Sequence, residues 1–259
     1  MLPPAGSVLG IDVGWSLKQR SSAICRLDWT PDRISWSVEH FTGVPETREA
    51  AVLALAGSHR FLAAALDGPL RGDLAIIDRY RVAERALLQE PIANRISQPG
   101  SSRSPVGRLL NHHTNEFARL LLANASIAEA THEHAIHPRA IVEAFPTSFL
   151  GLMIDSPEKG LRQRRSDRYF EALVANGTLA RRLTELLPNR TIVHYIGLLT
   201  HHDDRAAFVC ALTALLVAAN DYTAVGDTDG WIILPPLRWI APWARPFLEG
   251  WNNSRGVQL

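Results

Sequence analysis

Five carboxylates lie where short apolar runs of the chain end or where an apolar helix is expected to begin: Asp12, Asp67, Glu143, Asp203 and Asp204. Desolvating an unpaired carboxylate costs several kcal/mol or shifts its pKa until the group is neutral. Carboxylates gathered at one place therefore need cations between them, and oxygen-only ligands select Mg²⁺ or Mn²⁺ rather than zinc. Two such ions about 4 Å apart can activate a water and stabilise the leaving oxygen of a phosphodiester. The residue types indicate metal-dependent phosphodiester hydrolysis without a covalent nucleophile.

Asp12 is the acid that most needs an explanation. The run from Val8 to Val13 is short, aliphatic and stopped by Gly14, which predicts a buried first strand with one carboxylate in it. Asp12 either holds a cation or caps the turn that follows, in an Asx-type turn closing on Trp15. The local sequence leaves both interpretations open.

The segments after this strand predict the sheet that would position the acids. Residues 22–29 and 34–41 each alternate apolar and polar side chains and are separated by a turn, which predicts a three-strand antiparallel meander with the first strand. Helical spacing over residues 46–56 and an apolar run at 61–66 predict a crossover helix and a parallel strand that ends at Asp67. This order is typical of a ribonuclease-H-like mixed α/β sheet flanked by helices.

A helical insertion is expected between the fourth and fifth strands, over residues 71–138. Its helices are predicted at residues 76–88 and 108–129, with a Pro/Ser/Gly-rich loop between them at 99–105. The next strand is predicted at residues 140–146, again an apolar run that holds one acid, Glu143, and is closed by proline. We expect a single domain over residues 1–259, with the insertion at the rim of an acidic cleft.

The C-terminal half is expected to be largely helical. Helices are predicted near residues 167–175, 179–187 and 206–219, with Thr200 as N-cap of the third, while residues 191–199 read equally well as a strand or a short buried helix. A short edge strand is predicted at residues 231–234, followed by an irregular Trp/Pro-rich cover. Asp203 and Asp204 precede the apolar helix, where acids also interact favourably with the helix dipole.

Five segments together carry a resemblance to a known family. They are Gly10-Ile11-Asp12, Leu66-Asp67-Gly68-Pro69-Leu70, Val142-Glu143-Ala144-Phe145-Pro146, Phe208-Val209-Cys210-Ala211-Leu212-Thr213-Ala214 and Gly230-Trp231-Ile232-Ile233-Leu234-Pro235. Over most of its length the chain resembles the uncharacterised family of predicted ribonuclease-H-like nucleases. The resemblance implies that fold, nuclease activity on DNA or RNA, and Asp12, Asp67 and Glu143 as the carried-over acids.

The fourth metal ligand is left open by the resemblance. Members of the family often place an acid directly before the alanine of the last motif, where this chain has Ala206. Asp203 lies three residues earlier and hence on the same helix face, whereas Asp204 serves if the helix starts late.

Two rival functions start from the same residues. The segment Gly10-Ile11-Asp12-Val13-Gly14 also resembles the first phosphate loop of actin-like ATPases and sugar kinases, although no second Asp-x-Gly loop or Gly-Gly adenosine segment follows. A non-catalytic nucleic-acid-binding module on the same fold is the other rival.

Histidines form two further groups in the sequence. His132, His134 and His137 lie in a polar stretch without metal-ligand spacing, which favours loop histidines. His201 and His202 stand beside the acids and suit either proton shuttling or a polar role at the helix start.

A basic run follows the strand that holds Glu143. A run of charges in a protein usually forms only a solvent-exposed face. Here we nevertheless expect four of the basic residues to bind substrate phosphates: Lys159, Arg162, Arg164 and Arg165.

Composition limits the remaining classes of protein. The formal net charge of 259 residues is +1, so any polyanion site must be a local patch. The first residues lack the basic start and apolar core typical of a signal peptide, and the longest apolar run, at residues 206–219, falls short of the ~20 residues that span a bilayer, so no membrane partner is expected. Cys25 and Cys210 suit buried free thiols and predict a reducing, cytoplasmic location. Oligomeric state and substrate identity are not encoded in any motif.

Overall fold

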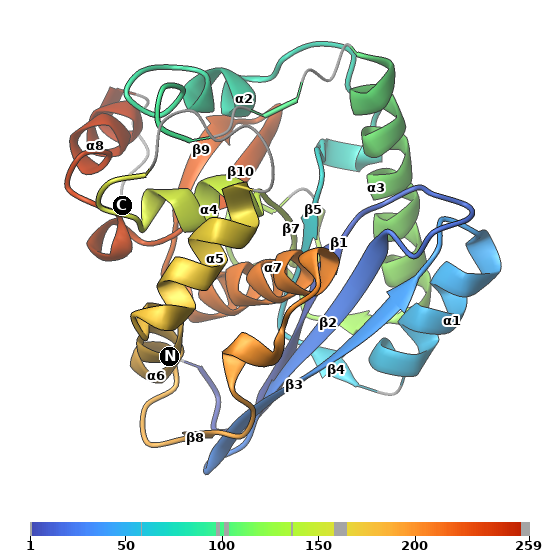
Figure 1. The fold of residues 1–259 in the computed structure, drawn as a ribbon. Coiled ribbons are helices and arrows are strands. Elements are labelled where there is room, and N and C mark those ends of the chain that lie inside the picture. The colour runs from blue at the N-terminus through green and yellow to red at the C-terminus, as the bar shows by residue number, and fades with distance from the viewer. Residues whose placement is uncertain are drawn as a thin grey trace.

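The computed structural model describes residues 2–57, 59–96, 99–100, 104–135, 137–157 and 165–254, with side chains described up to residue 251. Within these ranges the chain forms a mixed sheet of eight strands in the order β8-β3-β2-β1-β5-β7-β10-β9. Helices pack on both faces of this sheet (Figure 1). The predicted α/β class with antiparallel and parallel strands is confirmed.

The strands at the centre of the sheet follow the predicted order. β1 (Gly6–Asp12) pairs antiparallel with β2 (Ser22–Trp29), which pairs antiparallel with β3 (Arg33–Phe41). On its other side β1 pairs parallel with β5 (Ala64–Asp67), and β5 pairs parallel with β7 (Ile141–Ala144). The parallel strands are covered on both faces, which is why their sequences are almost continuous apolar runs.

The end of the sheet beyond β7 differs from the prediction. β10 (Gly230–Leu234) pairs parallel with β7 and antiparallel with β9 (Thr223–Asp227), so it is an interior strand. The predicted edge position of residues 231–234 is wrong because β9 covers that edge. Gly226 and Asp227 weakened the strand signal of β9, and the Asp227 side chain accepts a hydrogen bond from the Asp229 amide that closes the hairpin.

The helix α7 (His202–Ala219) lies against one face of the sheet and α1 (Pro45–Ala56) and α3 (Pro105–Asn124) against the other. Residues 206–217 of α7 are all buried, because helices α4 to α6 cover the side of α7 that faces away from the sheet (Figure 1). On the opposite face the rings of Phe41 and Phe117 join β3 to α3. The layers are therefore helix, helix, sheet and helix in the region of α7.

The insertion between β5 and β7 contains less helix than predicted. Of the expected helix over residues 76–88, only α2 (Val82–Leu87) forms, preceded by a 3₁₀ helix at Gly72–Leu74. α3 ends at Asn124 and not at 129, because β6 (Ser126–Ile127) pairs with β4 (Arg60–Phe61) in a separate two-stranded sheet.

The remaining elements fill the C-terminal half. Residues 191–199 contain both alternatives in short form, a two-residue strand and a 3₁₀ helix, and the Trp/Pro-rich tail includes a regular helix. The elements are α4 (Pro146–Leu152), α5 (Arg165–Ala175), α6 (Thr178–Leu186), β8 (Thr191–Ile192), 3₁₀ helices at Ile196–Leu198 and Leu237–Trp239, and α8 (Arg245–Ser254).

One general expectation about the chain is met. Cys25 and Cys210 are both buried free thiols. Among the described helices, none combines the length and hydropathy that crossing a bilayer requires.

Candidate metal centre

Four residues lie side by side on the strands β5, β1, β2 and β3, on the face of the sheet that α7 covers. Asp12 at the end of β1 is directly opposite Asp67 on β5, and opposite Ala23 on β2. Ala23 is in turn opposite His40 on β3. Directly opposed residues project to the same face, so Asp12, Asp67 and His40 share one face. The predicted meeting of Asp12 and Asp67 is confirmed by this register.

Gly10 explains why α7 approaches this row so closely. It lies two residues before Asp12 and so faces the same helix. A Cβ atom at this position would lie 2.0 Å from the Ala211 amide nitrogen and 2.2 Å from the Ala207 carbonyl oxygen. The helix backbone thus rests directly on the backbone of β1, which fixes the start of α7 above the strand ends.

The first turn of α7 carries two more acids into the row. The helix begins at His202, with His201 and not Thr200 as its N-cap. The Asp203 carboxyl lies close enough to Asp12 to contribute to the raised pKa of Asp12. Asp204 accepts a hydrogen bond from Nε2 of His40. We call Asp12, Asp67, Asp203 and Asp204 the carboxylate cluster.

Burial and mutual repulsion make this cluster electrostatically costly. The pKa of Asp12 is raised well above its ordinary value, first by burial and then by the charges of Asp67, Asp203 and Asp204. Burial raises the pKa of Asp67 to about 7, against a smaller opposing effect of His202. Within the described ranges neither Asp12 nor Asp67 forms an ion pair with Lys, Arg or His. A divalent cation between the carboxylates would relieve both costs, although among the described residues no three of these carboxylates bring ligand atoms within 4.8 Å of one another.

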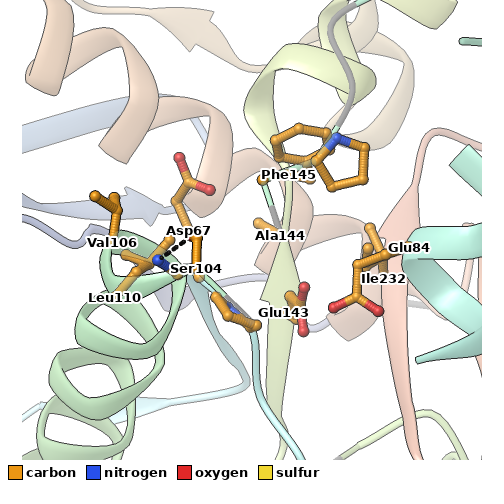
Figure 2. Close-up of a pocket in the computed structure, with 14 residues that line it drawn as sticks. Asp67, Glu84, Ser104, Val106, Leu110, Glu143, Ala144, Phe145 and Ile232 are labelled. Atoms are coloured by element: carbon orange, nitrogen blue, oxygen red, sulfur yellow. Dashed lines mark hydrogen bonds between the residues drawn. The ribbon is translucent and has the colours of Figure 1, made fainter. Parts of the chain in front are cut away.

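Glu143 is not part of this cluster. In the β5–β7 register it is opposite Leu66, the residue before Asp67, and therefore projects to the other face of the sheet. Figure 2 shows the Asp67 carboxylate directed away from Glu143, which lies beside Glu84. The structure thus separates Glu143 from Asp12 and Asp67, contrary to the expectation that all the strand-end acids meet.

Glu143 has a complete set of partners on its own face. Arg81, which is fully buried, lies 2.9 Å from Oε2 and donates to Oε1 over 3.0 Å, and the Leu70 amide donates to Oε2 over 2.8 Å. Arg81 also binds Glu84. Burial raises the pKa of Glu143 to about 7, while Arg81 and Leu70 favour its charged form. Burial alone would lower the pKa of Arg81, but Glu143 and Glu84 raise it above its ordinary value.

A small pocket of about 130 Å³ separates Asp67 from Glu143 (Figure 2). Its walls are mostly apolar and come from the start of α3, β10 and the segment after β7, including Val106, Leu110, Phe145 and Ile232. The insertion thereby contributes to the rim beside Asp67, and the pocket offers room for an apolar part of a ligand.

The histidines before β7 have a packing role. The His134 ring packs against Trp231 with centroids 4.6 Å apart, and its Nδ1 is 2.8 Å from the Tyr222 hydroxyl. Burial lowers the pKa of His132 to about 4. Within the described residues no third metal-ligating group joins this pair.

Only one of the four predicted phosphate-binding residues in the basic run lies within the described residues. Lys159, Arg162 and Arg164 lie outside the described residues, and Arg165 begins α5. Sequence reasoning did not consider a second pair of cations: Lys18 and Arg20 are exposed on the loop that follows Asp12. It also missed His40, since nothing local to residue 40 indicates contact with Asp204.

Searches with the sequence against protein-family models and curated proteins, and with the structure against solved structures, find no match. The function of the cluster must therefore be argued from its own geometry.

Proposed function

We propose that this protein is a metal-dependent nuclease, in which the carboxylate cluster holds Mg²⁺ or Mn²⁺ and hydrolyses phosphodiester bonds of DNA or RNA. The observation that carries the proposal is the convergence of four carboxylates from two strand ends and one helix start, with no Lys or Arg in the described chain paired to any of them. A folded protein tolerates such a group of acids when bound cations offset their repulsion.

The order of the strands supports the same proposal. A meander β3-β2-β1 continued by parallel β5 and β7 is the arrangement that the family resemblance implies for a ribonuclease-H-like sheet. Asp12 and Asp67 end the two central strands of that arrangement. We include two further statements in this proposal. The fold is ribonuclease-H-like, and the protein works in the reducing cytoplasm, which suits the free thiols of Cys25 and Cys210.

The contacts also divide the work between the two acids of α7. Asp203 faces Asp12 and is the third cation ligand beside Asp12 and Asp67, whereas Asp204 orients His40. Glu143 is left out of the ligand set because Arg81 already neutralises it. Metal ions held by the cluster would supply an activated water and stabilisation of the leaving oxygen.

Substrate contacts come from groups around the cluster. Lys18 and Arg20 extend from the loop after Asp12, where they can contact phosphates on either side of the scissile bond. Arg162, Arg164, Arg165 and Lys159 remain proposed as a second phosphate contact on the chain between α4 and α5. Phosphate contacts fix position without reading sequence, so we expect little sequence preference.

The experiment compares wild-type protein with Asp12→Asn on single-stranded, duplex, hybrid and branched substrates, with Mg²⁺ or Mn²⁺. Asp12→Asn should lower the rate at least about 100-fold because it removes a ligand shared by the cluster, while far-UV circular dichroism stays unchanged. Asp32→Asn is the matched control, since Asp32 is an exposed acid on the turn before β3.

Two results would replace the proposal. Binding of one substrate without hydrolysis would favour the nucleic-acid-binding module. ATP hydrolysis or sugar phosphorylation that depends on Asp12 would favour the actin-like and sugar-kinase-like phosphotransferases.

A further inference from the structure

Two histidines stand at the open side of the carboxylate cluster. His40 comes from β3 and His201 precedes the first turn of α7, and their rings meet edge to face with centroids 4.6 Å apart. Ligand atoms of His40, His201 and Asp203 all lie within 4.8 Å of one another. This spacing allows one cation to contact all three residues, with ligands from elements far apart in the sequence.

The protein holds the two imidazoles in different ways. His201 is the N-cap residue of α7, yet its side chain makes no capping hydrogen bond. The ring of His40 is held by Asp204, and a carboxylate behind a histidine is the usual way in which proteins orient a metal-binding ring. The exposed fractions of the two side chains are 22% and 55%, so a cation can enter from solvent.

The surrounding charges favour a cation here. Asp203 and Asp204 pair with no Lys or Arg among the described residues. The nearest arginine along the helix, Arg205, is turned toward Asp167 and Glu171.

A second histidine cluster in the molecule shows the contrast. His112, His113 and Glu116 on α3 also bring ligand atoms within 4.8 Å of one another. However, Arg48 lies 2.7 Å from both Glu116 and His113 Nδ1, so a guanidinium already occupies the centre of that group.

We propose that His40, His201 and Asp203 form a mixed nitrogen and oxygen site for a late first-row divalent cation, of the class of Co²⁺, Ni²⁺ or Zn²⁺. Imidazole binds these ions well, whereas Mg²⁺ prefers oxygen ligands. This site lies beside the carboxylate cluster, shares Asp203 with it, and makes the centre respond differently to transition metals than to Mg²⁺. Its effect on catalysis rests on the proposed function, but the binding itself does not.

Metal binding to the full-length, metal-free protein tests the site directly. Co²⁺ alone is titrated by calorimetry and by its visible absorption bands, and Mg²⁺ is titrated separately. His40→Gln and His201→Gln should each weaken Co²⁺ binding at least about tenfold, as loss of a ligand or its support does in other metal sites. Mg²⁺ affinity should change less than about twofold. His112→Gln is the matched control and should leave both affinities unchanged.

The outcomes separate this inference from the nuclease proposal. Unchanged Co²⁺ affinity in both variants at residues 40 and 201 would overturn the inference, and so would a parallel loss of Mg²⁺ binding or a loss in the His112→Gln control. His201 is exposed, so its variant reports on binding even where His40→Gln disturbs β3. If the wild-type protein cuts no substrate but these variants lose Co²⁺ binding, the inferred metal site stands and the nuclease proposal fails.

Discussion

Asp67 and Glu143 occupy neighbouring parallel strands, and burial raises the pKa of each to about 7. Their surroundings differ because the two side chains leave opposite faces of the sheet. Glu143 is met by a buried guanidinium and a backbone amide. Asp67 faces Asp12 and the first turn of α7, where the described chain offers it no ion pair. The two acids have similar local sequences, but only Glu143 is paired with a cation of the described chain.

This difference separates a structural acid from one that suits a ligand. A buried carboxylate with its own cation is part of the internal packing of the protein, and removing the cation leaves a charge that nothing else neutralises. A carboxylate beside other carboxylates keeps its electrostatic cost until a cation arrives from outside. The following changes test whether the two faces of the sheet differ in this way.

The largest effect is expected at Arg81. Arg81→Met should lower the free energy of unfolding by about 3–5 kcal/mol, because Glu143 and Glu84 would remain buried without their counter-ion. Urea unfolding followed by tryptophan fluorescence measures the change. Arg79→Met is the control: this side chain is 63% exposed and pairs with Asp229 at the surface, so its loss should change the free energy by less than about 1 kcal/mol. Equal effects of the two variants would remove the basis for treating Glu143 as structural.

Gly10→Ala should have the next largest effect and should act on the other face. The added Cβ would overlap backbone atoms of α7 at Ala207 and Ala211, which cannot rotate away. We expect a loss of about 1–3 kcal/mol in the free energy of unfolding. Mg²⁺ affinity should fall with it, because the helix that carries Asp203 must shift relative to Asp12. Calorimetric titration measures the affinity. Normal Mg²⁺ binding in the folded variant would show that the position of α7 does not define the site.

An effect of similar size to that of Gly10→Ala but of opposite sign is expected from Asp67→Asn in metal-free protein. Because the folded pKa of Asp67 is raised to about 7 from an ordinary value of 3.8, the folded state binds the proton more tightly than the unfolded chain. The stabilisation from this proton is therefore complete below about pH 4 and is lost as the pH rises to about 7. Asp67→Asn lacks this loss and should be more stable than wild type by about 1–3 kcal/mol at pH 8.

Urea unfolding in EDTA at pH 4 and pH 8 measures this prediction. The two proteins should be equally stable at pH 4 and should differ at pH 8, and saturating Mg²⁺ should favour the wild type, because it binds the metal better. Asp32→Asn should show neither effect. A destabilised Asp67→Asn variant at pH 8 without metal would mean that Asp67 has an internal partner, as Glu143 does.

Part of this arrangement could be read from residue patterns. The alternation in residues 22–29 and 34–41 predicted the meander, and the apolar runs before Asp12 and Asp67 predicted strands whose ends meet. These features depend on the period of side chains within one strand, which the sequence contains. The edge position of residues 231–234 was wrong because β9 has Gly226 and Asp227 where a strong strand signal would have β-branched residues.

The face to which Glu143 projects could not be predicted in this way. It depends on the register between β5 and β7, where a shift of one residue exchanges the two faces. The contact of His40 with Asp204 likewise depends on where α7 begins relative to the end of β3, and residue 40 carries no local sign of it. Arg81, within the insertion, showed no pattern that linked it to Glu143.

The close seating of α7 on β1 has a consequence for the order in which the site comes into existence. Asp12 and Asp67 belong to the first third of the chain, but Asp203 and the helix that carries it follow only in the last quarter. During synthesis, which proceeds from the N-terminus, the early strands emerge from the ribosome with half of the carboxylate cluster. The complete cluster is assembled only when α7 docks beside Gly10. If the proposed nuclease activity is correct, the growing chain stays inert toward the messenger RNA and ribosomal RNA around it until that docking.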